Sequence, residues 1–355
     1  MFFKDAHDPF VENKQRLNLS RHAYTVLLSD MEAFYLSDKV GNVEVSSGVI
    51  NQVFCRFYEQ ANASITIRLK YKEAEWHSML SSVEPYEVRE AIVQNLKEHY
   101  KTRLLEELEL RKEKGLIFSV RLDKQCRKCL ASGEVQELSI YYKEKVGRYL
   151  KAVIEEYASK PYIERERIWY RDTVQEIREA LEDRAMLKLT LRTGNILYIK
   201  PQGIQQDTER LYNYLYGFGS SQSKGPWQVM SVRLSSIVEC RCMSQSGYLD
   251  ATEKTEIEKA IQKNGVQYLS SHNSTERIVV EFTEKGEQMY RRLLHLRPVY
   301  ISRKNRIYEF ECTRFQAESY FFKFGCDVKI LEPQALVELF SKKYEEAAAI
   351  YRISE

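Results

Sequence analysis

The sequence predicts an α+β protein with three parts: a helical region, a small closed β-barrel and a C-terminal domain that mixes strands and helices. Residues 14–157 contain two similar strand–helix–helix patterns. Residues 181–243 contain four or five short alternating strands separated by turn sequences, the pattern of a small barrel. Residues 276–353 alternate strands with helices. A chain of 355 residues is long enough for roughly two to four domains.

The first part begins with an alternating segment and two amphipathic helices. The segment 14–20 (KQRLNLS) alternates, and Ser20 is suited to cap a helix that ends near Ala33. Ser46 is suited to cap a second helix, whose apolar face is formed by Val49, Ile50, Val53, Phe54 and Phe57. A strand followed by two helices is a ribbon–helix–helix unit, which needs a second copy to bury its core.

The second copy lies in the same chain. Residues 117–123 (IFSVRLD) are expected to form its strand, and Asp123 takes the capping role of Ser20. The helices that follow repeat the apolar positions of the first unit, with Cys126 and Cys129 on the core face. The sequence therefore predicts an intramolecular ribbon–helix–helix pair. A charged, Leu-rich helix between the copies is expected to pack against it and to end by Gly115.

The barrel segment contains aromatic residues at period two. The stretch LYNYLYGF (211–218) places its tyrosines and Phe218 on one face of a strand. Leu215 lies on the other face and is expected in the core, which leaves the tyrosine face at least partly exposed. Residues 181–243 contain eight Lys and Arg against five Asp and Glu. Aromatic faces beside cations suit a ligand with bases and phosphates.

Helical segments connect the parts. Pro161 is suited to open a helix that leads into the barrel, and residues 251–263 form a polar connecting helix after it. Beyond it, the order strand, helix, strand, strand, helix, strand is ferredoxin-like. The expected boundaries are 1–160 for the ribbon–helix–helix region, 161–249 for the linking helix and barrel, 250–275 for a connecting helix and linker, and 276–355 for the ferredoxin-like domain.

Composition excludes several classes of protein. The opening MFFKDAHDPF lacks the features of a secretory signal, and no apolar run is long enough to span a membrane. The seven cysteines are then expected to be free thiols in the cytoplasm. A net charge of +3 is small, so any basic surface must be local.

No pattern in the sequence predicts catalysis. Cys126 and Cys129, or Cys240 and Cys242, have a spacing compatible with zinc, but buried apolar thiols are expected at these positions instead. The six histidines lack metal-ligand spacing, and no phosphate-binding glycine loop or nucleophile elbow is present. We therefore expect no metal, no cofactor and no enzyme activity.

The barrel segment resembles a known domain family, the WYL domain, an Sm-like barrel of bacterial regulators. The resemblance rests on Pro201, a loop with Arg210, the run Asn213-Tyr214-Leu215, and the run 233–237 (RLSSI). Asn213 stands where the family has Trp, and Ser236 stands where it usually has Arg. Ligand contacts of the family at those two positions are therefore not carried over to this chain.

The whole layout resembles the WYL accessory proteins of type VI-D CRISPR systems. Beyond the barrel, the segments that support this are 148–170, 282–298 and 320–333, where Gly325 and Pro333 punctuate the C-terminal extension. The resemblance implies a homodimer that binds single-stranded RNA and augments an RNA-guided, RNA-targeting effector protein.

Two surfaces are candidates for nucleic-acid contact. On the barrel, basic and aromatic side chains could bind phosphates and stack on bases; these residues are Arg192, Lys200, Arg210, Tyr214 and Arg233. On the ribbon, the polar residues expected to face outward could contact base edges in a major groove; these residues are Arg16, Asn18, Ser119 and Arg121. Polar residues also face outward on any half-buried strand, and alternate tyrosines could simply fill the barrel.

Two further functions remain open. In a transcriptional regulator, the ribbon would bind operator DNA and the barrel would sense a ligand. In a protein–protein adaptor, no domain would bind nucleic acid. A homodimer is expected to form through the aromatic-rich C-terminal domain, whose candidate contacts are Tyr308, Phe315, Tyr320, Phe321 and Phe322.

Overall fold

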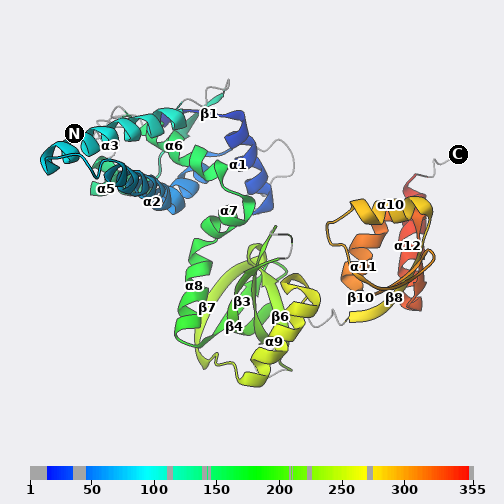
Figure 1. Ribbon diagram of the computed structural model, residues 1–355. Helices are drawn as coiled ribbons and strands as arrows, with labels where there is room; N and C mark the ends of the chain where they lie inside the picture. Colours follow the sequence, from blue (N-terminus) through cyan, green and yellow to red (C-terminus); the bar gives the residue numbers. More distant parts are fainter. Residues whose placement is uncertain are drawn as a thin grey trace. The chain divides into compact units, whose positions relative to one another are not determined.

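The computed structural model is an α+β protein with three antiparallel sheets in its described residues (Figure 1). The described residues are 14–34, 45–109, 115–137, 142, 145–207, 209, 211–221, 226–269 and 275–351. The chain divides into two compact units, residues 1–171 and 172–355.

The two predicted ribbon segments pair with each other within one chain. Strand β1 (Lys14–Leu19) runs antiparallel to β2 (Leu116–Arg121), with Arg16 opposite Ser119. Leu17, Leu19 and Val120 on the inner face are buried, as the alternation predicted.

The three predicted helix caps are confirmed. Ser20 accepts a hydrogen bond at the start of α1 (Arg21–Ala33), and Asp123 does so at the start of α4 (Lys124–Leu130). Ser46 caps α2 (Ser47–Met79), which runs well past the apolar face that predicted it and packs against α3 (Tyr86–Glu109) as a hairpin (Figure 1). The sequence pattern did not predict the full length of α2, because the distal half of this helix is mostly exposed and lacks a continuous apolar stripe.

Helix α6 (Val146–Ser159) is the centre of the helical core. It packs against α1, α2, α3 and β1, and ten of its residues are buried. Around it lie the short helix α5 (Gly133–Glu137) and α7 (Tyr162–Trp169), which Pro161 opens as predicted. The core contains residues of both strand–helix–helix copies, so neither copy buries its apolar face alone.

Two buried carboxylates fix α1 to the helices that follow. Glu155 accepts hydrogen bonds from the backbone N–H of Ser20, at 2.6 Å, and from its hydroxyl, at 2.7 Å. Asp30 accepts two hydrogen bonds from the guanidinium of Arg165, at 2.7 and 2.9 Å, and one from the Tyr157 hydroxyl, at 2.8 Å. Because buried charges are stable only when paired, these contacts specify how α1 packs.

The barrel segment forms a bent five-stranded sheet preceded by α8 (Arg171–Glu182). Its strands are β3 (Ala185–Leu191), β4 (Ile196–Gln206), β5 (Asn213–Ser220), β6 (Gln228–Arg233) and β7 (Ile237–Ser246), in the order β6-β5-β4-β3-β7. No ladder joins β6 to β7 in the described part of the chain, so the prediction of a closed barrel is wrong. After the short 3-10 turn η3 (Leu234–Ser236), β7 pairs with β3, and β6 and β7 are the two edge strands of the sheet.

The two faces of this sheet are covered by different helices. Leu187, Leu189 and Leu215 lie in a core with α8. Helix α9 (Ala251–Asn264) and the 3-10 turn η4 (Val266–Tyr268) pack against β5 and β6. Tyr214 and Tyr216 are therefore half-buried. The segment expected only to connect two domains is thus part of the barrel's packing.

The C-terminal part has the predicted order of strands and helices. It comprises β8 (Thr275–Phe282), α10 (Glu284–Arg292), β9 (Tyr300–Lys304), β10 (Ile307–Thr313), α11 (Arg314–Phe321), the 3-10 turn η5 (Phe322–Asp327), β11 (Val328–Glu332) and α12 (Gln334–Ile350). The sheet order is β11-β8-β10-β9, which leaves β9 at an edge.

The aromatic residues of this part mostly fill its interior. Tyr308, Tyr320 and Phe321 are buried in one core, and only Phe315 of the five candidate contacts is exposed. The argument that they form an exposed interface is therefore wrong, because the face of α11 and β10 on which they lie packs inward.

None of the described helices is both long and apolar enough to cross a membrane.

Candidate nucleic-acid interfaces

The ribbon presents a basic outer face. Arg16, Asn18, Ser119 and Arg121 are all exposed, as the sequence predicted, and Lys14 lies opposite Arg121 in the same ladder. Neither strand contains an acidic residue. In the described part of the chain, no ion pair joins Lys14, Arg16 or Arg121 to a carboxylate, so this face retains three positive charges.

The N-terminus of α2 fixes the end of this ribbon. The Asn51 amide donates a 2.9 Å hydrogen bond to the Arg121 carbonyl, and the Arg121 N–H donates a 3.0 Å bond to the Ser47 hydroxyl. Both bonds use the backbone of Arg121, so its side chain points outward from a rigid position. Asn51 and Ser47 are positioning residues that the sequence did not single out.

A groove of about 770 Å³ opens where the barrel is not closed. It lies between the β3–β4 turn, the edge strand β6 and η3. Its polar lining includes Asn195, Gln228, Ser231, Arg233 and Ser236, and Ile196 adds an exposed apolar side chain. Of these, only Arg233 was predicted. The others were missed because the groove depends on the missing β6–β7 ladder, which local sequence does not reveal.

Two predicted cations gather at this groove. The Arg233 guanidinium lies 3.4 Å from the ring centroid of Tyr212, a close cation–π contact that fixes its direction. The Nε–H of Arg192 donates a 2.7 Å hydrogen bond to the Ser235 carbonyl. The backbone N–H of Arg192 donates a 3.0 Å hydrogen bond to the Ser236 carbonyl. The η3 turn thereby brings Arg192 beside the groove that Arg233 lines.

Lys200 and Tyr214 do not line the groove. Lys200 forms a 2.6 Å ion pair with Glu253 of α9 and lies over the ring of Trp227. Tyr214 is the strand partner of Arg233, so both side chains leave the sheet on the face against which α9 and η4 pack, and Tyr214 is half-buried there. Arg210 lies outside the described residues. Two of the five candidates therefore meet at the groove, and Lys200 is neutralised by a neighbouring acid.

Burial also raises the pKa of tyrosines on the face of the barrel sheet against which α9 and η4 pack. Desolvation, and then the nearby carboxylate of Glu258, raises the pKa of Tyr216. Desolvation raises the pKa of Tyr268 as well, with a further contribution from Glu209. Both groups are therefore neutral phenols at neutral pH and contribute packing and dipoles, not charge.

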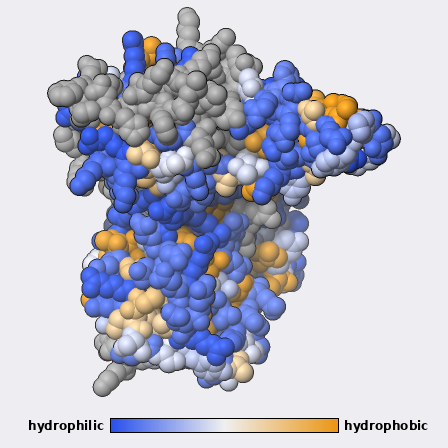
Figure 2. All heavy atoms as spheres, turned by 90° about the vertical axis from the view of Figure 1, so that its left-hand side faces the viewer, coloured by the Kyte–Doolittle hydropathy of each residue, from blue (hydrophilic) through white to orange (hydrophobic). Residues whose placement is uncertain are grey.

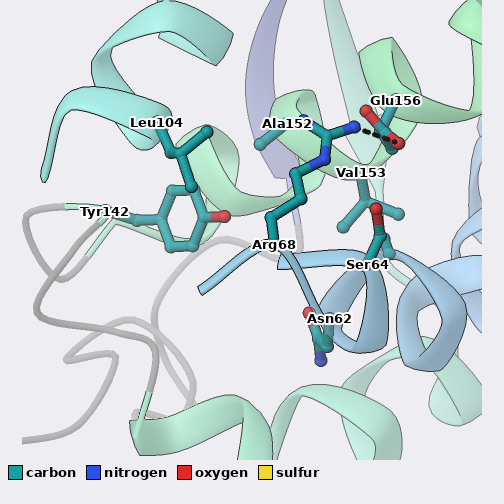
Figure 3. A pocket seen from close by; sticks show the side chains of 9 residues that line it. Asn62, Ser64, Arg68, Leu104, Tyr142, Ala152, Val153 and Glu156 are labelled. Atoms are coloured by element: carbon teal, nitrogen blue, oxygen red, sulfur yellow. Dashed lines mark ion pairs between the residues drawn. The ribbon is translucent and has the colours of Figure 1, made fainter. Parts of the chain in front are cut away.

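A smaller cavity lies in the helical unit, among α2, α3 and α6 (Figure 3). Its volume is about 20 Å³, and its rim holds the ion pair between Arg68 and Glu156 at 3.6 Å. Tyr142, Leu104 and Val153 form its apolar wall. A space of this size suits one water-sized group, so the barrel groove is the better candidate for a ligand.

On the surfaces of the parts that Figure 2 shows, hydrophilic residues predominate and hydrophobic residues form small, separate patches. Large contiguous apolar patches commonly mark protein-binding surfaces.

Comparison with known proteins shows the fold. No protein-family model and no curated protein matches the chain. A solved structure described as the crystal structure of a CRISPR Cas-related protein is similar over 99% of this chain and 97% of its own, with a TM-score of 0.72 and 23% identity. Proteasome accessory factor B/C (PafBC) of Arthrobacter aurescens aligns with 67% of this chain and 37% of its own, with a TM-score of 0.29 and 15% identity. The first similarity extends over both compact units, and the second is too low to support an argument.

Proposed function

We propose that the protein is a nucleic-acid-binding accessory protein of a CRISPR system and that its barrel groove binds single-stranded RNA. The observation that supports this most is the groove itself: Arg233 lines it, Arg192 lies beside it, and hydrogen-bonding side chains form the rest of its polar lining. The similarity in fold to a CRISPR Cas-related protein gives the biological setting. The resemblance to WYL accessory proteins adds the expected polymer and an RNA-targeting effector as partner.

The chemistry of the groove favours unpaired RNA. The amides of Asn195 and Gln228 can donate to and accept from a base edge, which a duplex would hide. Arg192 and Arg233 can bind the phosphates on either side. Ile196 offers an apolar surface against which a base can pack.

The test is RNA binding by the variant Arg192→Ala/Arg233→Ala at fixed salt. Losing two phosphate contacts should reduce affinity for a single-stranded RNA at least tenfold, or about 1.4 kcal/mol. The matched control is Arg241→Ala, which removes an exposed cation of β7 that is paired with Glu239 outside the groove. Fluorescence anisotropy with RNA and duplex DNA of equal length measures both effects. Equal loss in the control, or tighter binding to duplex DNA in the parent protein, would refute RNA binding at this site.

A second candidate function is duplex DNA binding by the ribbon, as in a transcriptional regulator. The observation in its favour is the exposed ladder with Lys14, Arg16 and Arg121 and no acid. Two-stranded ribbons fit the major groove of DNA, where Arg and Asn side chains bond base edges. The two functions use different units of the chain, so they are compatible.

We further propose that the protein is a homodimer formed through its C-terminal part. Strand β9 is a free edge in the described sheet, and Val299, Tyr300, Ile301 and Ile307 at or beside it are exposed. An exposed apolar edge is a surface on which a second strand can add. Sedimentation of Ile301→Lys should show a monomer, whereas an unchanged dimer would place the contact elsewhere.

A further inference from the structure

Three cysteine thiols from two helices meet inside the helical unit. Cys55 lies on α2, and Cys126 and Cys129 lie on α4. The sulfur of Cys129 is 4.0 Å from that of Cys55, and Cys126 is the neighbour with the largest influence on the pKa of Cys55. Cys126 is fully buried and Cys55 nearly so, whereas Cys129 is partly exposed.

The environment makes one of these thiols the better nucleophile. The hydrogen bond from Cys126 lowers the pKa of Cys55, and a smaller effect of Arg171 acts in the same direction. Burial raises the pKa of Cys129 to about 11. Since the thiolate is the more nucleophilic form of cysteine, the lowered pKa favours Cys55 over Cys129 as the sulfur that is oxidised first.

We propose that Cys55 and Cys129 are an oxidation site, at which a peroxide forms a reversible disulfide between α2 and α4. The Cys55 thiolate attacks one peroxide oxygen, the O–O bond breaks, and a sulfenic acid and hydroxide result. The Cys129 sulfur then attacks the sulfenic sulfur, the S–O bond breaks, and the hydroxide leaves with the thiol proton as water. Two thiols are oxidised and one peroxide is reduced to two waters. An external thiol reverses the reaction by exchange.

The position of the bond gives it a structural consequence. Helix α4 begins three residues after Arg121, and α2 holds the Arg121 backbone through Ser47 and Asn51. A covalent link between α2 and α4 would therefore restrict the movement of α2, whose Ser47 and Asn51 hold the end of the ribbon. The sulfurs must approach from 4.0 Å to the ~2.05 Å of a disulfide, a change that side-chain rotation and a small helix shift can supply.

The experiment uses the full chain with both exposed cysteines replaced, Cys242→Ser/Cys326→Ser, to prevent links between molecules. Hydrogen peroxide should lower the intact mass by about 2 Da, and peptide mapping should join Cys55 to Cys129. Unfolding of the helical unit should shift upward by about 5–10 °C and return after dithiothreitol. Adding Cys129→Ser, at a partly exposed position that tolerates the change, should abolish all three effects. Adding Cys312→Ser, a buried thiol of the C-terminal core, should abolish none.

Two results would overturn the proposal. One is a mass gain of about 16 or 32 Da without a cross-link, which would mean that the thiols oxidise separately. The other is a link from Cys55 to Cys126, which would remove Cys129 from the reaction.

Discussion

The ribbon and the barrel groove both present cations, but they hold them differently. On the ribbon, Lys14, Arg16 and Arg121 project from a short ladder whose two strands contain no acidic residue. At the barrel, Arg233 is held over Tyr212 and Arg192 is tied to the η3 turn. Exposed charges without a fixed side-chain contact supply attraction that depends on salt and little on sequence, whereas oriented side chains can discriminate between ligands. The two regions are therefore expected to differ in salt dependence and in selectivity.

The largest effect should come from removing the buried carboxylate that supports the ribbon unit. Asp30→Ala leaves the Arg165 guanidinium without its bidentate partner in a site where both side chains are almost fully buried. Breaking such a pair typically costs ~3–5 kcal/mol of unfolding free energy. Hydrogen exchange should show loss of protection in α1 and α7, and RNA binding at the barrel should persist.

The control for this prediction is Glu239→Ala, which removes one partner of an exposed ion pair and should cost at most about 1 kcal/mol. If Asp30→Ala abolished RNA binding along with ribbon stability, the two regions would not be independent.

An intermediate effect is expected from the ribbon charges. Replacing Lys14, Arg16 and Arg121 with Ala should weaken duplex DNA binding about 100-fold and lower the slope of log affinity against log salt by about three. RNA affinity should stay within a few-fold. A salt titration measures both, with Lys70→Ala/Lys259→Ala/Lys329→Ala as a charge-matched control at exposed sites that are not part of the ribbon strands. Equal loss in the control would show that only net charge matters.

The smallest effect concerns Lys200. Glu253→Gln removes the charge that neutralises Lys200, while the amide can still accept the backbone hydrogen bond of the α9 capping box. Because the pair is partly exposed, we expect RNA affinity to rise only about twofold. Glu256→Gln, an exposed acid on the same helix, is the control. No difference between the two variants would exclude Lys200 from the RNA surface.

Local sequence predicted the elements of this fold but not the features that depend on distant contacts. Ser20, Ser46 and Asp123 cap the helices that the pattern indicated, because a cap acts within three residues of itself. Alternation also predicted correctly that Leu215 is buried and that Arg16 is exposed. The ion pair of Lys200 could not be predicted, since its partner Glu253 lies on a helix that the sequence indicated only as a connection between domains. The groove was missed for the same reason: it depends on which strands pair.

The intramolecular ribbon has a consequence for the symmetry of any target. In a ribbon built from two identical chains, each side chain occurs twice about a dyad axis, so the matching DNA is palindromic. Here Arg16 lies opposite Ser119, and Asn18 lies opposite Ile117, so the two strands present different rows of side chains. A polymer bound to this face would have a defined polarity, and its preferred sequence would have no inverted repeat.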